Sequence, residues 1–192
     1  KERQNIFNKE LPEDFYEKRK IGENDSSICE IIRKDNIKDF IMFINKNDYS
    51  LNAQIKMSVY ETNRFLIKKS HGLTLIKYAA FFGSVSIFKY LIANEVEIAP
   101  GLLPFAIHGQ NEEIIHLIQK NNIKYSEYIE CLYESIKCYQ NDAAIYFLNN
   151  HVYNQILDPN AYIRDSCIKC YNFVLLSNDL VDESSFYYLC KY

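Results

Sequence analysis

Glycine is scarce in this 192-residue chain, which contains only five. A glycine-rich loop of the kind that cradles a phosphate is missing, so we expect no nucleotide chemistry. An excess of positive charge is missing too, because 22 basic side chains stand against 25 acidic ones and leave a net charge of −3. A basic field that would hold nucleic acid or anionic lipid is therefore not expected.

Long apolar runs are also missing. The apolar stretches are well short of the roughly 18 residues that cross a membrane, because charged residues interrupt them at Lys77, Lys89, Glu95 and Glu97. In addition, no apolar segment precedes a signal-type cleavage site. We therefore expect no membrane partner. The six cysteines are scattered singly, without the dense framework of a small secreted domain. This spacing predicts free thiols in a reducing compartment, the cytoplasm or alternatively the nucleus.

Apolar residues make up 48% of the chain, which is ample for one folded domain or for a continuous stack of repeats. The stretch from Gly72 to Val96 predicts a helix, a turn and a second helix. Thr74 is placed to cap the first helix, Gly83 to end it in the left-handed conformation, and Ser84 to cap the second. Two such short helices cannot bury both faces alone, so the unit needs neighbours stacked on it.

The helix–turn–helix pattern recurs along the chain. Aligning Ala79 with Ala106 lays the central unit on residues 105–118, and aligning Asn111 with Asn141 lays that copy on residues 135–148. Residues 167–172 begin a further copy with a poorly formed second helix, and residues 186–192 resemble one more first helix. Upstream, residues 28–45 form a degenerate first repeat in which Asn36 and Asp39 are a capping pair.

These patterns divide the chain into three parts. Residues 1–27 are predicted to form an N-terminal helical cap over the first repeat, with a frayed terminus as the alternative. Residues 28–70 hold the degenerate first repeat and an insertion with a short helix packed on the stack. Residues 71–192 hold the repeats, the last of them incomplete. Because the chain starts at Lys1 without Met, we expect a piece of a longer protein in which further repeats follow.

The central unit resembles the ankyrin repeat in the residues Gly72, Thr74, Ile76, Ala79, Ala80, Gly83, Leu91 and Ile92. It departs from that pattern at Leu75, where the family has Pro, and at Lys77, where it has His. Together with Ala-Ile-His-Gly-Gln-Asn and the closing Phe-Tyr-Tyr-Leu-Cys-Lys-Tyr, it resembles the divergent ankyrin proteins of trichomonad-type parasites, whose N-terminal part is a domain of unknown function. The resemblance covers residues 16–192.

This resemblance implies an all-α, ankyrin-type helical-repeat solenoid and a non-catalytic scaffold for protein–protein contacts. Because the copies follow one another at less than the roughly 33 residues of an ankyrin unit, the fingers between them are expected to be shortened. In the family, the two residues after the Ala-Ala pair face the concave surface. Carried over, this predicts a partner-binding concave strip, with space filling between repeats as the alternative; its members are Arg33, Lys34, Phe81, Phe82, His108, Tyr139 and Tyr171.

Cys167-x-x-Cys170 is the one motif that invites metal or redox chemistry, since both sulfurs lie on one helical face. Cys138 and His108 hold equivalent positions in neighbouring repeats, but helices about 8–10 Å apart exceed a metal–sulfur bond of about 2.3 Å. We therefore expect ordinary thiols and no metal. Cys–His pairs drawn from Cys131, Cys138, His108, His116 and His151 lack a nucleophile elbow and an orienting carboxylate.

The sequence thus predicts no catalytic residue, no cofactor and no small-molecule substrate, and it favours a protein-interaction scaffold with an unknown protein partner. The alternative is a structural module that self-associates through its C-terminal repeat end. Such an end needs cover because aromatic and apolar residues gather there without a second helix; these are Phe186, Tyr187, Tyr188, Leu189 and Tyr192. They are expected to dock onto residues 167–176 or to pair with another copy.

Overall fold

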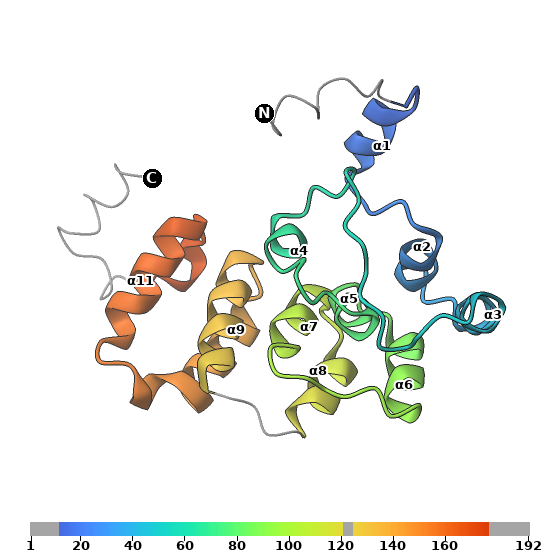
Figure 1. Cartoon of the computed structure of the whole chain (residues 1–192). Coiled ribbons are helices and arrows are strands. Elements are labelled where there is room, and N and C mark those ends of the chain that lie inside the picture. Colours follow the sequence, from blue (N-terminus) through green and yellow to red (C-terminus); the bar gives the residue numbers. More distant parts are fainter. Residues whose placement is uncertain (1–11, 121–124, 177–192) are drawn as a thin grey trace, which may run out of the picture.

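The computed structural model describes residues 12–120 and 125–176, and this part of the chain is all-helical (Figure 1). Its one β-type contact is an isolated bridge between Gln54 and Thr74. The all-α prediction is confirmed at this level. The helices are α1 Phe15–Ile21, α2 Ser27–Arg33, α3 Ile37–Asn47, α4 Arg64–Lys68, α5 Leu75–Phe81, α6 Val85–Ala93, α7 Leu103–Gly109, α8 Glu112–Gln119, α9 Tyr125–Lys137, α10 Asn141–Phe147 and α11 Pro159–Cys170. Short π and 3-10 turns follow at Leu148–Val152, Tyr153–Gln155 and Phe173–Leu175.

Most of these helices form antiparallel pairs joined by a tight turn: α2 with α3, α5 with α6, α7 with α8, and α9 with α10. The first helices of the pairs contact one another in chain order, from α2 through α5, α7 and α9 to α11 (Figure 1). The second helices α3, α6 and α8 do the same on the other side. After α11 the described chain holds only the turn Phe173–Leu175 in place of a second helix.

Each turn within a pair contains one residue in the left-handed conformation, and it occupies the same place every time. These residues are Asp35, Gly83, Gln110, Tyr139 and Tyr171, with φ between 47° and 67°. The prediction for Gly83 is confirmed, and it is the only one of the five that adopts this conformation without a steric cost. The turns of the described pairs are therefore built alike, although their sequences differ.

In three of these turns the residue after the left-handed position donates a side-chain hydrogen bond to the preceding first helix. In each case the acceptor is a main-chain carbonyl near the end of the preceding first helix, where the helix itself no longer supplies the regular partner. The three bonds run from Ser84 Oγ to Ile32 O, from Gln140 Nε2 to Ile107 O, and from Asn172 Nδ2 to Ile136 O. Neighbouring pairs are thus joined by polar as well as apolar contacts.

Between α5 and α7 the backbones come so close that no side chain fits. A Cβ atom on Gly109 would lie 2.1 Å from Ala80 O and 2.8 Å from Gly83 N. A Cβ atom on Gly83 would lie 2.6 Å from Gly109 O. These three neighbours are main-chain atoms, which cannot move aside as a flexible side chain could. The two glycines therefore set the spacing of the central pairs.

The capping of α6 differs from the prediction. The Ser84 hydroxyl makes no cap hydrogen bond and faces Ile32 instead. The N-terminal amides of α6, those of Ser86 and Ile87, donate to the two carboxylate oxygens of Asp35, each at 3.0 Å. Asp35 belongs to the preceding turn, so α6 is capped by its neighbour. Thr74 also stands at an N-cap position without a side-chain cap.

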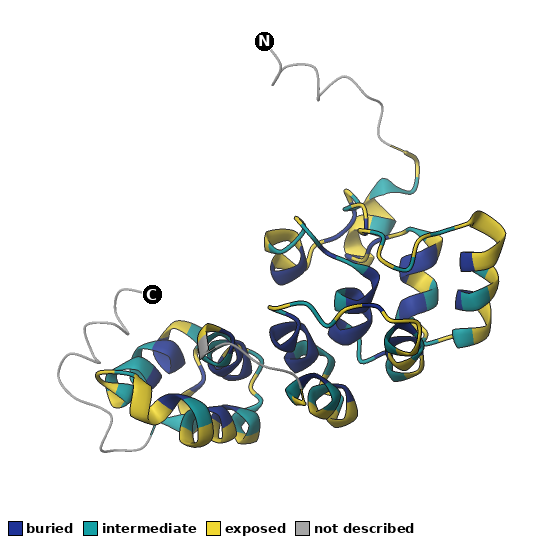
Figure 2. Cartoon of the chain, turned by 60° about the horizontal axis from the view of Figure 1, so that its bottom comes forward, coloured by how far each residue is buried: buried dark blue, intermediate teal, exposed yellow. Residues whose placement is uncertain are grey.

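The insertion contributes α4, a confirmed short helix that covers the first helices on the side away from α6 and α8 (Figure 1). Asn63 caps it by accepting from two amides, and Phe65 and Leu66 are buried. The Phe65 ring stacks on Phe81 at 5.9 Å and meets the Phe105 ring edge-on at 4.9 Å. With helices on three sides, α5 and α7 are almost wholly buried, and the buried faces in Figure 2 turn toward neighbouring helices.

The N-terminal cap contacts the first helix pair, as expected, because Arg33 of α2 pairs with Glu23 and donates to Asn24 O. The cap also rests on the insertion. Phe15 of α1 packs against Tyr60 with ring centroids 5.6 Å apart. Arg19 donates to Glu61 O, and Thr62 N donates to Gly22 O just after α1. The aromatic residues 186–192 and their predicted docking lie outside the described residues. Within the described residues, no helix combines the length and the apolar character needed to cross a membrane.

The contacts between pairs predict a large effect of Asn172→Ala. Asn172 is fully buried, and its Nδ2 also donates to Asn141 Oδ1 at 2.8 Å. Removing the amide leaves the buried carbonyl of Ile136 without this donor, so we expect a loss of about 1–3 kcal/mol in the free energy of unfolding, measured by urea denaturation.

Asn150→Ala is the matched control, because Asn150 is exposed and its side chain donates only within its own helical turn. We expect it to stay within about 0.5 kcal/mol of the wild type. Equal losses in both variants would show that the bond between pairs carries no special weight.

Candidate functional site

The structure divides the predicted concave strip into three groups. Arg33, Lys34 and Phe82 line a groove of about 540 Å³ between α1, α2 and the end of α5. The groove also contains Lys18 and Ile21 of α1. This group alone is gathered around an open space.

Phe81 and His108 are covered by the chain itself. Phe81 is 8% exposed. The His108 ring packs against both Phe65 and Phe81, with centroid distances of 4.3 and 4.8 Å. Since Phe65 belongs to α4, the insertion occupies the surface that these two residues were expected to offer. The space-filling alternative describes their surroundings better.

Tyr139 and Tyr171 lie one residue further along than the strip requires. Both hold the left-handed turn position, the place of Gly83, and both are about half exposed. The Tyr139 hydroxyl donates to the carbonyls of Cys170 and Tyr171 at 3.1 Å. The alignment of Asn111 with Asn141 was wrong by one residue, because Gln140 is the structural equivalent of Asn111.

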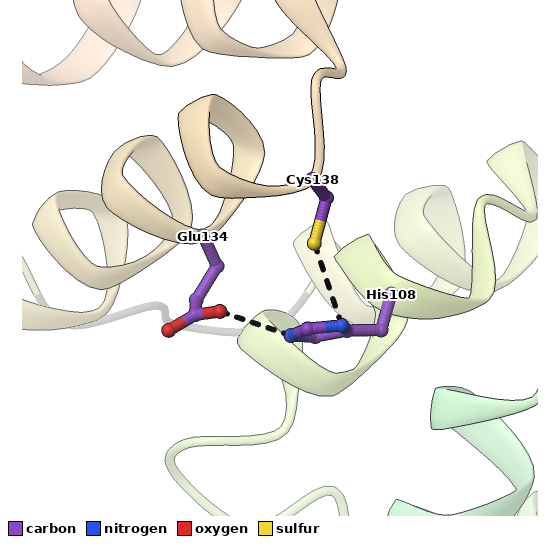
Figure 3. A group of neighbouring side chains, drawn as sticks. All are labelled: His108, Glu134 and Cys138. Carbon is purple, nitrogen blue, oxygen red and sulfur yellow. Dashed lines mark hydrogen bonds and ion pairs between the residues drawn. The ribbon is translucent and has the colours of Figure 1, made fainter. Parts of the chain in front are cut away.

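In the corrected register, Lys137 and Cys138 replace Tyr139 on the first-helix face. Cys138 forms a cluster with His108 and Glu134 (Figure 3). His108, on α7, lies beside Glu134 and Cys138 at the end of α9. His108 Nε2 is 3.0 Å from Glu134 Oε2, and Cys138 Sγ is 3.5 Å from His108 Nδ1. Lys137 Nζ donates to the same Glu134 oxygen at 2.9 Å.

The cluster centres on a buried carboxylate. Glu134 is 6% exposed, and burial alone would raise its pKa. The hydrogen bonds from His108 and Lys137 outweigh burial and hold the pKa of Glu134 below its usual value. Burial, followed by the negative charge of Glu134, raises the pKa of the Cys138 thiol. The carboxylate is therefore charged at neutral pH, and the thiol keeps its proton.

Thiol, imidazole and carboxylate follow one another here in the order of a nucleophilic triad. The surroundings oppose that chemistry. Cys138 lies at the C-terminal end of α9, where the helix dipole is negative and disfavours a thiolate. Activated cysteines have a depressed pKa, whereas that of Cys138 is raised. The cluster therefore favours a positive charge beside Glu134 rather than a reactive thiolate at Cys138.

The sequence-based view that Cys138 and His108 lie too far apart to share a ligand was wrong. Their helices are separated by the usual spacing, but the side chains bridge the gap. Glu134 was not singled out, although its place four residues before Cys138 puts both on one helical face. Among the described residues, Cys167 is buried, Cys170 is half-buried and both are free thiols outside this cluster.

The other cysteines and histidines considered from the sequence are scattered. Cys131 is buried, and burial raises the pKa of its thiol far above the usual range. His116 is exposed on α8. His151 stacks on Tyr128 at 3.9 Å. Within the described residues, Cys131, His116 and His151 do not belong to the cluster of His108, Glu134 and Cys138.

Comparisons of this chain with family models, with curated proteins and with solved structures found no match. Its function is therefore argued from its own residues.

The depressed pKa of Glu134 predicts an acid-dependent part of the stability. Because the folded state holds the proton more weakly, the ionised carboxylate stabilises the fold above the ordinary glutamate pKa of about 4.3. This contribution is lost as the pH falls through the folded-state pKa. Glu134→Gln lacks it, so we expect its melting temperature to lie below that of the wild type at about pH 5.5 and to approach it near pH 3.

Glu97→Gln serves as the control, since Glu97 is exposed and lies outside the cluster. Its melting temperature should follow the wild type across the same range. A deficit of Glu134→Gln that stays constant with pH would contradict the charged hydrogen-bond network.

Proposed function

We propose that this chain is an ankyrin-type, helical-repeat scaffold that binds a segment of another protein and catalyses no reaction. The observation that carries this proposal is the recurrence of one turn geometry in successive helix pairs, three of whose turns are hydrogen-bonded to the preceding first helix. Stacked pairs of this kind form extended surfaces that repeat proteins use for binding. The turns and their spacing also support the resemblance to divergent ankyrin proteins of the trichomonad type.

The groove between α1, α2 and α5 is the binding surface that we favour. Its cations are already paired: Arg33 with Glu23 at 2.9 Å, and Lys34 with Glu30 at 2.6 Å. Lys18 is paired with Asp14 and lies 3.9 Å from Asp25. With both signs balanced, the groove has no surplus charge for a phosphate or a nucleic acid.

The apolar members of the groove determine what fits it. Phe82 is half-buried, with Tyr78 and Phe81 rings behind it and the Arg33 guanidinium 6.0 Å from its ring centre. Ile21 is 69% exposed at the opposite wall. An apolar floor ringed by paired charges suits an aromatic or aliphatic side chain from a partner segment that carries charges of both signs.

The described cysteines are free thiols, which supports a reducing compartment, the cytoplasm or the nucleus.

Selection of binders from a displayed random-peptide library tests this surface. We expect enriched peptides with one aromatic or large aliphatic residue flanked by charges. Their affinity should fall at least about tenfold for Phe82→Ser, because the variant removes the apolar floor of the groove. The measurement is a fluorescence-anisotropy titration of the selected peptides on the purified full chain.

Tyr153→Ser is the matched control, because Tyr153 is an exposed aromatic residue on a turn far from the groove residues in the chain and absent from its lining. It should bind as the wild type does, and circular dichroism should show both variants folded. Peptides that bind Phe82→Ser and wild type equally would exclude the groove.

A second candidate function, self-association, is favoured by an apolar hollow of about 490 Å³ at the other end. Side chains of α9, α10 and α11 line it together with Val174, Leu175 and Leu176. Val174 is 77% exposed beside it. The hollow lies beside α11 and the turn that follows it, and we take a second copy of the chain as its occupant.

Sedimentation equilibrium at two protein concentrations tests this. The average mass of the wild type should rise with concentration, and Val174→Asp should reduce that rise because it places a charge in the apolar contact. Val59→Asp, at an exposed position of the insertion, should leave it unchanged. A monomer at both concentrations would rule out self-association.

A further inference from the structure

The cluster of His108, Glu134 and Cys138 lies outside the groove, and the scaffold function leaves it unused. Its members come from two neighbouring helix pairs, α7 on one side and the end of α9 on the other (Figure 3). One potential ligand atom from each residue lies within 4.8 Å of the other two. Three different donor types thus lie together between the pairs, with the thiol at Nδ1 and the carboxylate at Nε2 of one imidazole.

Their spacing matches a tetrahedral ion. A zinc ion with sulfur at about 2.3 Å and nitrogen at about 2.0–2.1 Å holds these two ligands roughly 3.5 Å apart. Cys138 Sγ and His108 Nδ1 are 3.5 Å apart. Glu134 lies at the other edge of the same ring, within the 4.8 Å span, so a rotation of its side chain brings a carboxylate oxygen toward the same point.

The electrostatics of the place favour a cation. The last carbonyls of α9 carry partial negative charge, and Cys138 follows directly after that helix. Glu134 is buried, and its carboxylate contacts both His108 and Lys137. In the structure, Lys137 supplies the positive charge, with its Nζ 2.9 Å from Glu134 Oε2. Its side chain is 41% exposed, so it is able to turn into solvent when another cation arrives.

The donor set selects the ion. A thiolate and an imidazole prefer zinc and similar borderline metals, whereas magnesium and calcium need mostly oxygen ligands. We propose that His108, Glu134 and Cys138 bind one zinc ion between α7 and α9, with water as the fourth ligand. The thiol gives up its proton to solvent as the Zn–S bond forms. The ion then links two successive helix pairs, and this proposal does not depend on the peptide-binding groove.

Phe65 and Phe81 both pack against the imidazole, at centroid distances of 4.3 and 4.8 Å. This packing fixes the plane of the ring and leaves its nitrogen edge directed at α9. A ligand whose orientation is fixed before the ion binds loses little conformational freedom on binding. Substitution of His108 would disturb this packing, so the test uses the other two ligands.

Cobalt(II) titration of the metal-free full chain tests the proposal, because cobalt takes zinc sites and reports a bound thiolate by a sulfur-to-cobalt charge-transfer absorption. We expect one equivalent of cobalt to produce this band together with the visible absorption of a tetrahedral site, and zinc to abolish both. Absence of the charge-transfer band in the wild type at excess cobalt would overturn the site.

Cys138→Ser should remove the band while circular dichroism stays unchanged. Cys170→Ser is the matched control, since Cys170 occupies the corresponding place at the end of α11 and is outside the cluster. It should keep the full band. A band that survives Cys138→Ser, or that is lost in Cys170→Ser, would overturn the assignment of the sulfur ligand.

Two further variants test the oxygen ligand and the competing charge. Glu134→Gln should weaken zinc binding at least about tenfold, measured by competition with a chelating dye. Lys137→Met keeps the aliphatic stem but removes the ammonium group that occupies Glu134, so zinc should bind more tightly than to the wild type. Unchanged affinity in both variants would overturn the role of Glu134.

Discussion

Three turns are held to the preceding helix pair by a side-chain hydrogen bond to the end of its first helix. Every helix ends with carbonyls that it cannot satisfy itself, and close packing excludes water from them. Ser84, Gln140 and Asn172 each donate to a carbonyl in the last turn of such a helix, and the carbonyls of Ile32 and Ile136 also accept an amide of their own turn. This also explains why Ser84 does not cap its own helix: its hydroxyl is engaged elsewhere, and Asp35 takes over the capping of α6.

The local parts of this architecture could be predicted from the sequence. Glycine at the end of a helix, Asn36 accepting from Asp39, and apolar residues at helical spacing each have a short-range physical cause, and all appear in the structure. The register of the later turns could not be predicted in the same way. Tyrosine is a poor residue for the left-handed conformation, so Tyr139 gave no sign of its place, while the repeated Gln-Asn dipeptides suggested a wrong one.

The candidate site shows where reasoning from repeats stops. Glu134 and Cys138 share a face because they lie four residues apart, which is readable from the sequence. His108, on α7 of the preceding pair, meets them only because long side chains reach between the helices. Its enclosure by Phe65 depends on an insertion whose position no periodic pattern specifies. Local rules thus locate the candidate ligands, and tertiary packing decides which of them meet.

The position of α4 has a consequence for how the chain folds. In a plain stack each pair touches only its neighbours, so folding can start anywhere and spread step by step. Here Phe65 contacts α5 and α7, and Lys69, just after α4, forms an ion pair with Glu130 of α9 at 2.7 Å. One short segment thus spans three consecutive pairs and is far from α9 in the chain. Such long-range contacts slow folding relative to a plain stack and favour cooperative opening of the three pairs.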